Sequence, residues 1–181
     1  CLDPKDLNKA IKRCHHKTPT VEEITYNLAG AQYFSKLDAK NGYWSVKLDN
    51  ESSMLTTFNT LLGRYRYLRM PFGLVMSQDV FQRKMDQILE QCKNCIGIAD
   101  DVIVFGKTEE DHDRNLLKLM EVGKQSGLVF NSDKCDIKKD KVKFFGTIYD
   151  KDGAHPDPEK IEAIKSIPSP GPQRSYSRSW V

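Results

Sequence analysis

Residues 95–105 read CIGIADDVIVF, in which two apolar arms flank the adjacent aspartates Asp100 and Asp101. Each arm is about as long as a strand, and two residues suffice for a tight hairpin turn. We therefore expect an otherwise buried hairpin that holds two carboxylates at its tip. Adjacent buried anions repel each other and are costly to desolvate unless cations neutralise them.

A third carboxylate, Asp38, ends another strand-like segment, residues 33–38 (YFSKLD). Aspartate oxygens are ligands that suit Mg²⁺. Three aspartates on two strands are typical of a two-metal site for phosphoryl transfer. The pattern therefore predicts a metal site where the strand and the hairpin meet.

The bulk composition is that of a globular protein rather than a disordered one. The chain has 181 residues, of which 39% are hydrophobic and 29% charged, enough for one domain with a core. The net charge of +3 permits nucleic-acid binding without demonstrating it. No apolar run approaches the roughly 20 residues that cross a bilayer, and no signal peptide is visible.

The cysteines do not form a secreted disulfide framework, because their number, five, is odd. We expect a reducing, intracellular and cytoplasmic location. Cys92 and Cys95 form a CxxC, for which half a zinc site with His15 or His16 is one interpretation. Two thiols at a helix-to-strand junction are the simpler interpretation.

Local signals predict the first elements along the chain. Thr20 and Glu23 form a capping-box pattern that starts a helix, with Gly30 after its end. Trp44, Val46 and Leu48 alternate with polar residues and predict a half-buried strand. Residues 55–60 and 64–69 are expected to be strands joined around Gly63.

The second half of the chain reads as helices around the hairpin. Ser77 is expected to cap one helix and Thr108 another. The residues expected to face the core are Phe81, Met85, Ile88 and Leu89 in the first helix and Leu116, Leu119 and Met120 in the second. Gly127 is expected to end the second helix. Residues 141–149 read as a strand, and a short helix starts at Asp157. The predicted fold class is α+β, with a mostly antiparallel sheet, helices on one face and the carboxylates on the other, open face.

Seven short segments follow one another along the chain and together form a recognisable pattern: FSKLDAKNGYW (34–44), LTTFNTLLGRYRYLRMPFGL (55–74), FQRKMDQIL (81–89), GIADDVIVFG (97–106), GLVFNSDKC (127–135), FFG (144–146) and PDPEKIEAI (156–164). In this order and spacing the chain resembles the reverse transcriptases of long-terminal-repeat retrotransposons of the Ty3/Gypsy type, over about residues 1 to 170. The resemblance implies a right-hand polymerase palm with partial fingers, from a Pol polyprotein.

The resemblance also implies catalytic roles. Asp38, Asp100 and Asp101 would hold two Mg²⁺, with Mn²⁺ as a substitute, and the carbonyl of Ala39 would assist. The implied reaction is RNA-directed DNA synthesis, in which a primer 3′-hydroxyl attacks the α-phosphate of a dNTP. The family often has an aromatic where Ile98 stands.

Further residues match family positions around the nucleotide. Backbone N–H groups of Asn41 and Gly42 would face the triphosphate, and Tyr43 would lie beneath the sugar and favour dNTPs over rNTPs. Phe72 and Gly73 would pack under nucleotide and template; retroviral relatives usually carry Gln where Phe72 stands. Lys134 would approach the triphosphate.

Two further groups match family positions that contact the nucleic acid. Phe145 and Gly146 would grip the primer strand, and Arg64, Arg66 and Arg69 would meet template phosphates. The implied partners are an RNA or DNA template, a DNA or tRNA-type primer and dNTPs. A virus-like particle in the cytoplasm is the location that the family implies.

The resemblance divides the chain into a reverse transcriptase domain over 1–155, with fingers at 1–32 and 49–70 and palm at 33–48 and 71–155. Residues 156–181 would begin the thumb. The first residue is Cys1, so we expect a fragment that lacks upstream finger residues, most of the thumb, ribonuclease H, protease and integrase. The family text after residue 171 runs close to KKLQSFLG, and a codon choice for 173–181 gives KKLQSFLG when read two bases later. We therefore expect a frameshifted tail from about 172.

Two other functions fit parts of the pattern. An inactive retroelement relic would keep the fold and the nucleic-acid-binding surface without synthesis. Another two-metal palm enzyme, such as a nucleotidyl cyclase, would share the aspartate hairpin but has no reason to carry RYRYLRMPFGL (64–74).

Overall fold

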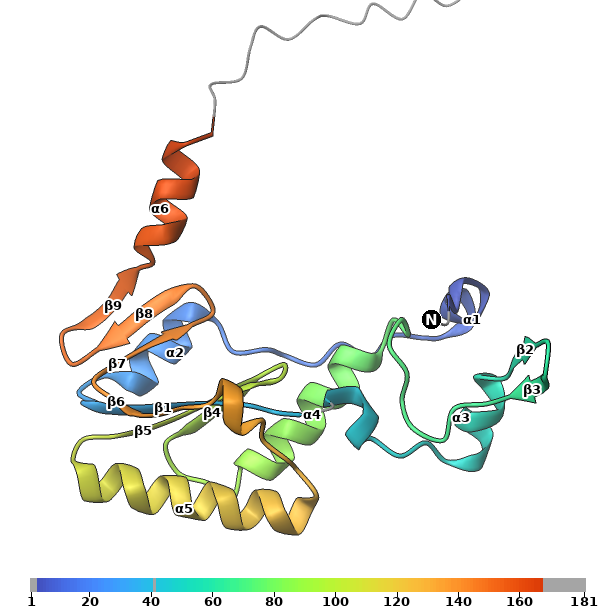
Figure 1. Cartoon of the computed structure of the whole chain (residues 1–181), viewed down its shortest axis with the longest axis horizontal. Coiled ribbons are helices and arrows are strands. Elements are labelled where there is room, and N and C mark those ends of the chain that lie inside the picture. The colour runs from blue at the N-terminus through green and yellow to red at the C-terminus, as the bar shows by residue number, and fades with distance from the viewer. Residues whose placement is uncertain (1–2, 41, 168–181) are drawn as a thin grey trace, which may run out of the picture.

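The computed structural model describes residues 3–40 and 42–167. Its centre is an antiparallel sheet of four strands in the order β4-β5-β1-β6, where β4 is Cys95–Ile98, β5 is Asp101–Gly106, β1 is Tyr33–Asp38 and β6 is Asp136–Lys139. The predicted hairpin is the β4–β5 pair, and β1 lies beside it (Figure 1). The α+β class expected from the sequence is therefore confirmed.

The hairpin turn lies one residue earlier than its aspartate pair indicates. Ile98 pairs with Asp101, so the two turn residues are Ala99 and Asp100, and Asp101 opens β5. Ala99 has a φ of 51°, in the left-handed region that residues with a side chain rarely adopt. The apolar pattern predicts the hairpin but not this register. An aspartate is tolerated both in the turn and at the adjoining strand end, so the Asp-Asp pair does not show which residues form the turn.

Helices α4 (Ser77–Leu89) and α5 (Glu109–Ser126) cover one face of the sheet (Figure 1). Val102 and Val104 of β5 and Leu37 of β1 point toward them. The buried apolar residues of the two helices are Phe81, Met85, Ile88, Leu89, Leu119 and Val122. Full burial of each such side chain contributes roughly 1.5–3 kcal/mol, so this packing positions the hairpin on α4.

The opposite face of the sheet is not fully open, which corrects the expectation of helices on one face. Helix α2 (Val21–Leu28) packs there, as does a second sheet of β7 (Lys141–Phe144), β8 (Thr147–Asp150) and β9 (Gly153–Pro156). Phe34, Ile103 and Phe105 point into this second core because strand side chains alternate between faces. The expected strand over 141–149 is thus a hairpin, which turns at Phe145 and Gly146.

The capping box of α2 is confirmed, since Thr20 Oγ1 accepts from the Glu23 amide and the Glu23 carboxylate accepts from the Thr20 amide. Thr108 caps α5 as expected, and Gly127 ends that helix with a φ of 74°. Ser77 is wrong as a cap: it is the first residue of α4, and its hydroxyl donates to the Pro71 carbonyl at 3.1 Å.

Met120 is also wrong as a core residue, because 46% of its surface is exposed. The buried positions of α5 are His112, Asn115, Leu119, Val122 and Gly123, which share one face at helical spacing. Leu116 is partly buried and packs against the same core.

Segment 42–69 extends away from the sheet and differs most from the prediction (Figure 1). Residues 44–48 are not a strand: η1 (Gly42–Ser45) is a 3₁₀ helix, and the Ser45 hydroxyl donates to the Gly42 carbonyl at 2.7 Å. Helix α3 (Asn50–Leu55) follows, capped by Asp49. The strands expected over 55–60 and 64–69 are shorter than predicted: they form the hairpin of β2 (Phe58–Thr60) and β3 (Gly63–Tyr65), because Leu55 ends α3 and residues 66–69 lie outside β3.

The first and last helices lie on different parts of the molecule. Helix α1 (Lys5–Ala10) lies on the side of α3, and α6 (Pro158–Lys165) projects from β9 (Figure 1). Asp157 caps α6, with Pro158 as its first residue, as expected. Lys134 lies in the short 3₁₀ helix η2 (Ser132–Lys134) before β6. No helix of the described chain has the length and apolarity that a membrane span needs.

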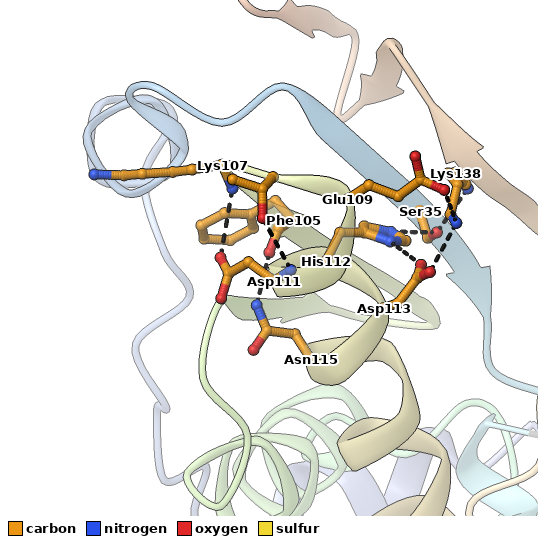
Figure 2. A network of polar contacts seen from close by, with 10 residues as sticks. Ser35, Phe105, Lys107, Glu109, Asp111, His112, Asp113, Asn115 and Lys138 are labelled. Carbon is orange, nitrogen blue, oxygen red and sulfur yellow. Dashed lines mark hydrogen bonds and ion pairs between the residues drawn. The ribbon is translucent and has the colours of Figure 1, made fainter.

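A buried polar network joins α5 to the sheet (Figure 2). His112 has no exposed surface; its Nε2 lies 2.8 Å from Ser35 Oγ, and its Nδ1 lies 3.0 Å from Asp113 Oδ1. Ser35 Oγ also accepts from the Lys138 amide at 2.9 Å, and Lys138 Nζ pairs with Asp113. Ser35 therefore donates to Nε2, and the imidazole donates from Nδ1. A side chain at Gly106 would collide with the His112 backbone.

Candidate catalytic site

The three aspartates come together at one end of the central sheet. Asp38 and Asp101 are directly opposite each other across β1 and β5, and Asp100 is in the adjoining turn. The Ala39 amide donates to the Asp100 carbonyl at 2.6 Å, which ties the turn to the end of β1. Like charges that face each other across strands are destabilising, so this end of the sheet requires compensating cations.

Two lysines supply part of that compensation. Lys36 precedes Asp38 by two residues on the same strand face, and its Nζ lies 3.1 Å from Asp101 Oδ2. Lys134 Nζ lies 3.9 Å from Asp38 Oδ2. Lys134 was predicted from the sequence, whereas Lys36 was missed although the period-two rule could have found it.

Asp100 keeps an unfavourable charge. Loss of surrounding water raises the pKa of its carboxyl, and the negative charges of Asp38 and Asp101 raise it further, against a smaller opposing effect of Lys134. The backbone of Gly42 lies so close to this carboxylate that a Cβ atom there would collide with Asp100 Oδ1. The site thus carries more negative charge than its lysines neutralise.

Tyr43 and Phe72 form an aromatic pair beside the carboxylates. Their ring centroids are 5.0 Å apart, and Tyr43 also packs edge-on against Phe81 at 5.7 Å. Burial raises the pKa of the Tyr43 hydroxyl, and so does the nearby negative charge of Asp100. Tyr43 is therefore both a core residue and a neighbour of the aspartates, while Phe72 remains about half exposed.

The turn that carries Phe72 is held by a residue that the sequence did not indicate. Asn8 of α1 donates through Nδ2 to the Gly73 carbonyl at 2.8 Å and accepts at Oδ1 from the Val75 amide at 2.9 Å. Gly73 has a φ of 96°, which favours glycine there. No sequence signal identifies Asn8, because its partners lie more than sixty residues away.

Other predicted residues lie elsewhere. Arg64 is in β3, whereas Arg66 donates to Asn50 Oδ1 at 3.0 Å and Arg69 to the Trp44 carbonyl at 3.2 Å, so only Arg64 lies in a strand of the expected 64–69 segment.

The predicted primer-grip residues are at the turn between β7 and β8. Phe145 has a φ of 48° and is half exposed, and Gly146 lies against Lys160 of α6. Ile98, which stands where the family often has an aromatic, is buried in the second core. Asn41 lies outside the described residues.

The donor set fits divalent cations in chemistry and charge. Carboxylate oxygens are the ligands of Mg²⁺ and Mn²⁺, and the raised pKa of Asp100 marks an anion that a cation would stabilise. Across residues 3–40 and 42–167, no three His, Cys, Asp or Glu side chains already converge as metal ligands. Asp38 and Asp101 are turned toward their lysines instead.

A protein-family model described as reverse transcriptase (RNA-dependent DNA polymerase) matches residues 1–149, which include all three aspartates. The chain belongs to the reverse transcriptase family. Its relatives include the retrovirus-related Pol polyproteins of transposons 297 and gypsy from Drosophila melanogaster, 34% and 33% identical over 93% of this chain. The chain spans 16% of the length of each of these polyproteins.

A viral relative of this reverse transcriptase chain is the enzymatic polyprotein of figwort mosaic virus, 33% identical over 91% of the chain and 25% of the polyprotein. Among solved structures, a foamy viral protease-reverse transcriptase in complex with double-stranded DNA matches 93% of this chain and 30% of that chain. Its TM-score is 0.84 at 23% identity, a likeness of fold. The chain is thus a reverse transcriptase domain of the kind found in retroelement Pol polyproteins.

Proposed function

We infer that this domain carries out RNA-directed DNA synthesis by transferring nucleotides from dNTPs to a primer 3′-hydroxyl. The observation that carries the inference is the facing pair Asp38 and Asp101, with Asp100 in the adjoining turn. The excess negative charge there supports divalent-cation binding. Two bound Mg²⁺ would supply activation of the 3′-hydroxyl and charge stabilisation of the leaving pyrophosphate.

The chain's own residues would bind and orient the reactants. Asp38, Asp100 and Asp101 would hold the cations, with the Ala39 carbonyl in support. Lys134, beside Asp38, is suited to a triphosphate oxygen and to giving a proton to pyrophosphate. Catalysis of this kind depends mainly on positioning and charge. The contacts of the Asp100 carbonyl with the Ala39 amide and of Asp101 with Lys36 would help to position the carboxylates.

Nucleotide selection would depend on the aromatic pair. The Tyr43 ring, braced between Phe72 and Phe81, supports a rigid surface beneath the sugar. Such a surface would exclude a 2′-hydroxyl and favour dNTPs. Gly42 and Asn41 would offer backbone amides to the triphosphate, and Gly73 would let Phe72 approach the base.

The partners would be a primer and a template of RNA or DNA. Two foamy viral relatives of this fold were solved with double-stranded DNA and with an RNA/DNA hybrid. Phe145 and Gly146 would contact the primer, and Arg64, the exposed arginine of β3, the template. We assign segments 1–32 and 49–70 to the fingers, 33–48 and 71–155 to the palm and residues from 156 to the thumb. A cytoplasmic particle is the proposed location.

Asp100→Asn tests the function directly. We expect single-nucleotide incorporation on an RNA template to fall by at least roughly 100-fold, because a metal ligand is lost. Asp152→Asn, on an exposed turn of the second sheet, is the matched control and should retain activity.

Asp100→Asn should also be more stable to unfolding than the original chain when metal is absent. A carboxyl whose pKa is raised on folding destabilises the folded state once pH rises above its unfolded value of 3.8, and Asn removes that cost. After allowance for solvent screening, we expect a gain of roughly 0.5 kcal/mol at pH 7, measured by urea unfolding. In the activity test, equal nucleotide incorporation by the original chain and by Asp100→Asn would indicate an inactive relic.

A further inference from the structure

Helix α4 has a polar stripe on its inner side. Asp79, Gln82 and Asp86 lie three and four residues apart, so they share one helical face. Asp79 and Gln82 are buried, with 5% and 2% of their surface exposed. Burial of a polar side chain is costly unless it is hydrogen-bonded, so the partners of these residues indicate why they are there.

The amide of Gln82 is fully used. Nε2 donates to the Gly97 carbonyl at 2.8 Å and to Asp86 Oδ1 at 2.9 Å. Oε1 accepts from the Ala99 amide at 3.0 Å. A single side chain of α4 thus holds the end of β4 at Gly97 and the first residue of the aspartate turn, Ala99.

The close approach that allows these bonds depends on Gly97. A Cβ atom there would lie 2.6 Å from a Leu89 methyl carbon and 2.8 Å from Met85 Cγ. Without a side chain at position 97, β4 lies directly on α4, and the Gln82 amide reaches both sides of Ile98.

Ala99 needs such a partner. Its φ of 51° is unfavourable for a residue with a Cβ by about 1–2 kcal/mol, and the surrounding structure must compensate for that strain. The Gln82 carbonyl accepts the Ala99 amide and so favours this conformation. The same turn sets the direction in which Asp100 leaves the backbone.

We propose that Gln82 is a positioning residue: it holds the Ala99–Asp100 turn so that the Asp100 carboxylate faces Gly42 and Asp38. The proposal rests on the proposed polymerase function for its catalytic meaning, and on the hydrogen bonds alone for its structural meaning. Gln82 does not touch substrate or metal; it acts through the backbone of residue 99.

The amide of Gln82 is itself oriented from outside. Asp86 Oδ2 lies 2.6 Å from His16 Nε2, so Asp86 joins the N-terminal segment to Gln82. Asp79, one turn earlier, accepts from the Arg13 side chain at 2.6 Å and from the His16 amide at 3.1 Å. The segment before α2 therefore braces the helix face that holds the turn.

The test compares Gln82→Met and Gln82→Glu with Gln91→Met in the 181-residue chain. Met fills similar volume without hydrogen bonds, whereas Glu keeps the acceptor for Ala99 and loses both donors. Gln91 is exposed just beyond α4 and is the matched control. Two readouts are amide hydrogen exchange at Ala99 and the affinity for Mn²⁺ measured by electron paramagnetic resonance, with Asp100→Asn as the reference for specific binding.

We expect Gln82→Met to speed exchange at Ala99 by about tenfold or more, as one lost hydrogen bond would, and to weaken Mn²⁺ binding by about fivefold. Gln82→Glu should protect Ala99 better than Gln82→Met does. In single-nucleotide incorporation, kcat should fall by roughly 10–100-fold with the KM for dNTP changed much less.

Exchange and Mn²⁺ affinity within twofold of the original chain in a folded Gln82→Met variant would overturn the proposal. If Gln82→Met unfolds, Gln82→Asn decides by the same two limits, because its shorter side chain stays polar but withdraws the acceptor from the Ala99 amide. Faster exchange in a chain whose Mn²⁺ binding does not exceed that of Asp100→Asn would support the role of Gln82 in the turn and count against the polymerase function instead.

Discussion

At Gly42 the backbone of η1 passes so near Asp100 that the carboxylate occupies the place of a side chain. The sequence motif indicated this glycine for its amide, toward a triphosphate. The structure adds a steric reason, which sequence reasoning could not supply because Asp100 is far away along the chain. The same residue thus serves two requirements at once.

Gly42→Ala should displace the Asp100 carboxylate or shift η1. We expect nucleotide incorporation to fall by at least roughly tenfold, since small displacements at a reacting centre are costly. The matched control is Gly123→Ala in α5, whose Cβ would make only ordinary contacts, the nearest at 3.5 Å. That control should stay active and gain up to about 1 kcal/mol of stability from helix propensity. Full activity of Gly42→Ala would contradict the steric argument.

The cysteine pair also shows what sequence reasoning could and could not decide about single residues. Burial and the neighbouring Cys92 raise the pKa of the Cys95 thiol to about 12. Cys92 follows α4 and Cys95 opens β4, so the pair lies at a helix-to-strand junction, as the simpler interpretation has it. His16, the zinc partner considered from the sequence, hydrogen-bonds Asp86.

Among elements, those with strong local signals were predicted well. Helices α2, α5 and α6 each have a capping residue close by in sequence, and the β4–β5 hairpin has two apolar arms around its turn. Residues 44–48 were predicted wrongly because alternation in a short segment does not distinguish a strand from a 3₁₀ turn packed against other elements. The β7–β8 turn was missed because no turn-forming dipeptide precedes Gly146, whereas Asp152-Gly153 at the turn between β8 and β9 is a turn signal that could have indicated the rest of the second sheet.

Helix α1 gives a prediction at this scale, through its contact with the turn after Phe72. Asn8→Ala removes one donor and one acceptor from the 73–75 backbone. Each bond contributes about 1 kcal/mol, so we expect the KM for dNTP to rise by roughly fivefold or more as Phe72 loses its fixed place beside Tyr43. Steady-state incorporation kinetics measure it.

Asn8→Asp gives an internal comparison, because it keeps the acceptor for the Val75 amide and loses only the donor to Gly73. Its KM should fall between those of the original chain and Asn8→Ala. An unchanged KM in both variants would mean that the turn holds its shape without α1.

At the scale of the whole molecule, one hydrophobic core packs on each face of the central sheet, and the three aspartates lie at one end of that sheet. The three aspartates and the family could be predicted from the sequence, because they lie in ordered phrases with apolar flanks. The supporting contacts of Lys36, Gln82 and Asn8 could not all be predicted, since they depend on which distant elements meet. The charge pattern of each strand can be read locally from the sequence, whereas the close approach of β4 to α4 depends on residues far apart in the chain.

The network around His112 should contribute to global stability rather than to chemistry. His112→Ala would leave a cavity and remove the partner of Ser35 Oγ, so we expect the free energy of unfolding to fall by about 2–4 kcal/mol in urea titrations. His155→Ala, an exposed imidazole beside Asp150, should change it by less than about 0.5 kcal/mol. Similar losses in both variants would contradict a special role for the buried network.

The strand order also sets when the site can exist during synthesis. Strand β1 has its two neighbours, β5 and β6, much later in the sequence, so it leaves the ribosome with both edges unpaired. At about 5–20 residues per second, the chain waits several seconds before Asp38 can meet Asp101. Until then its apolar strand is open to chaperones and to aggregation, and the three aspartates can come together only after β5 has been synthesised.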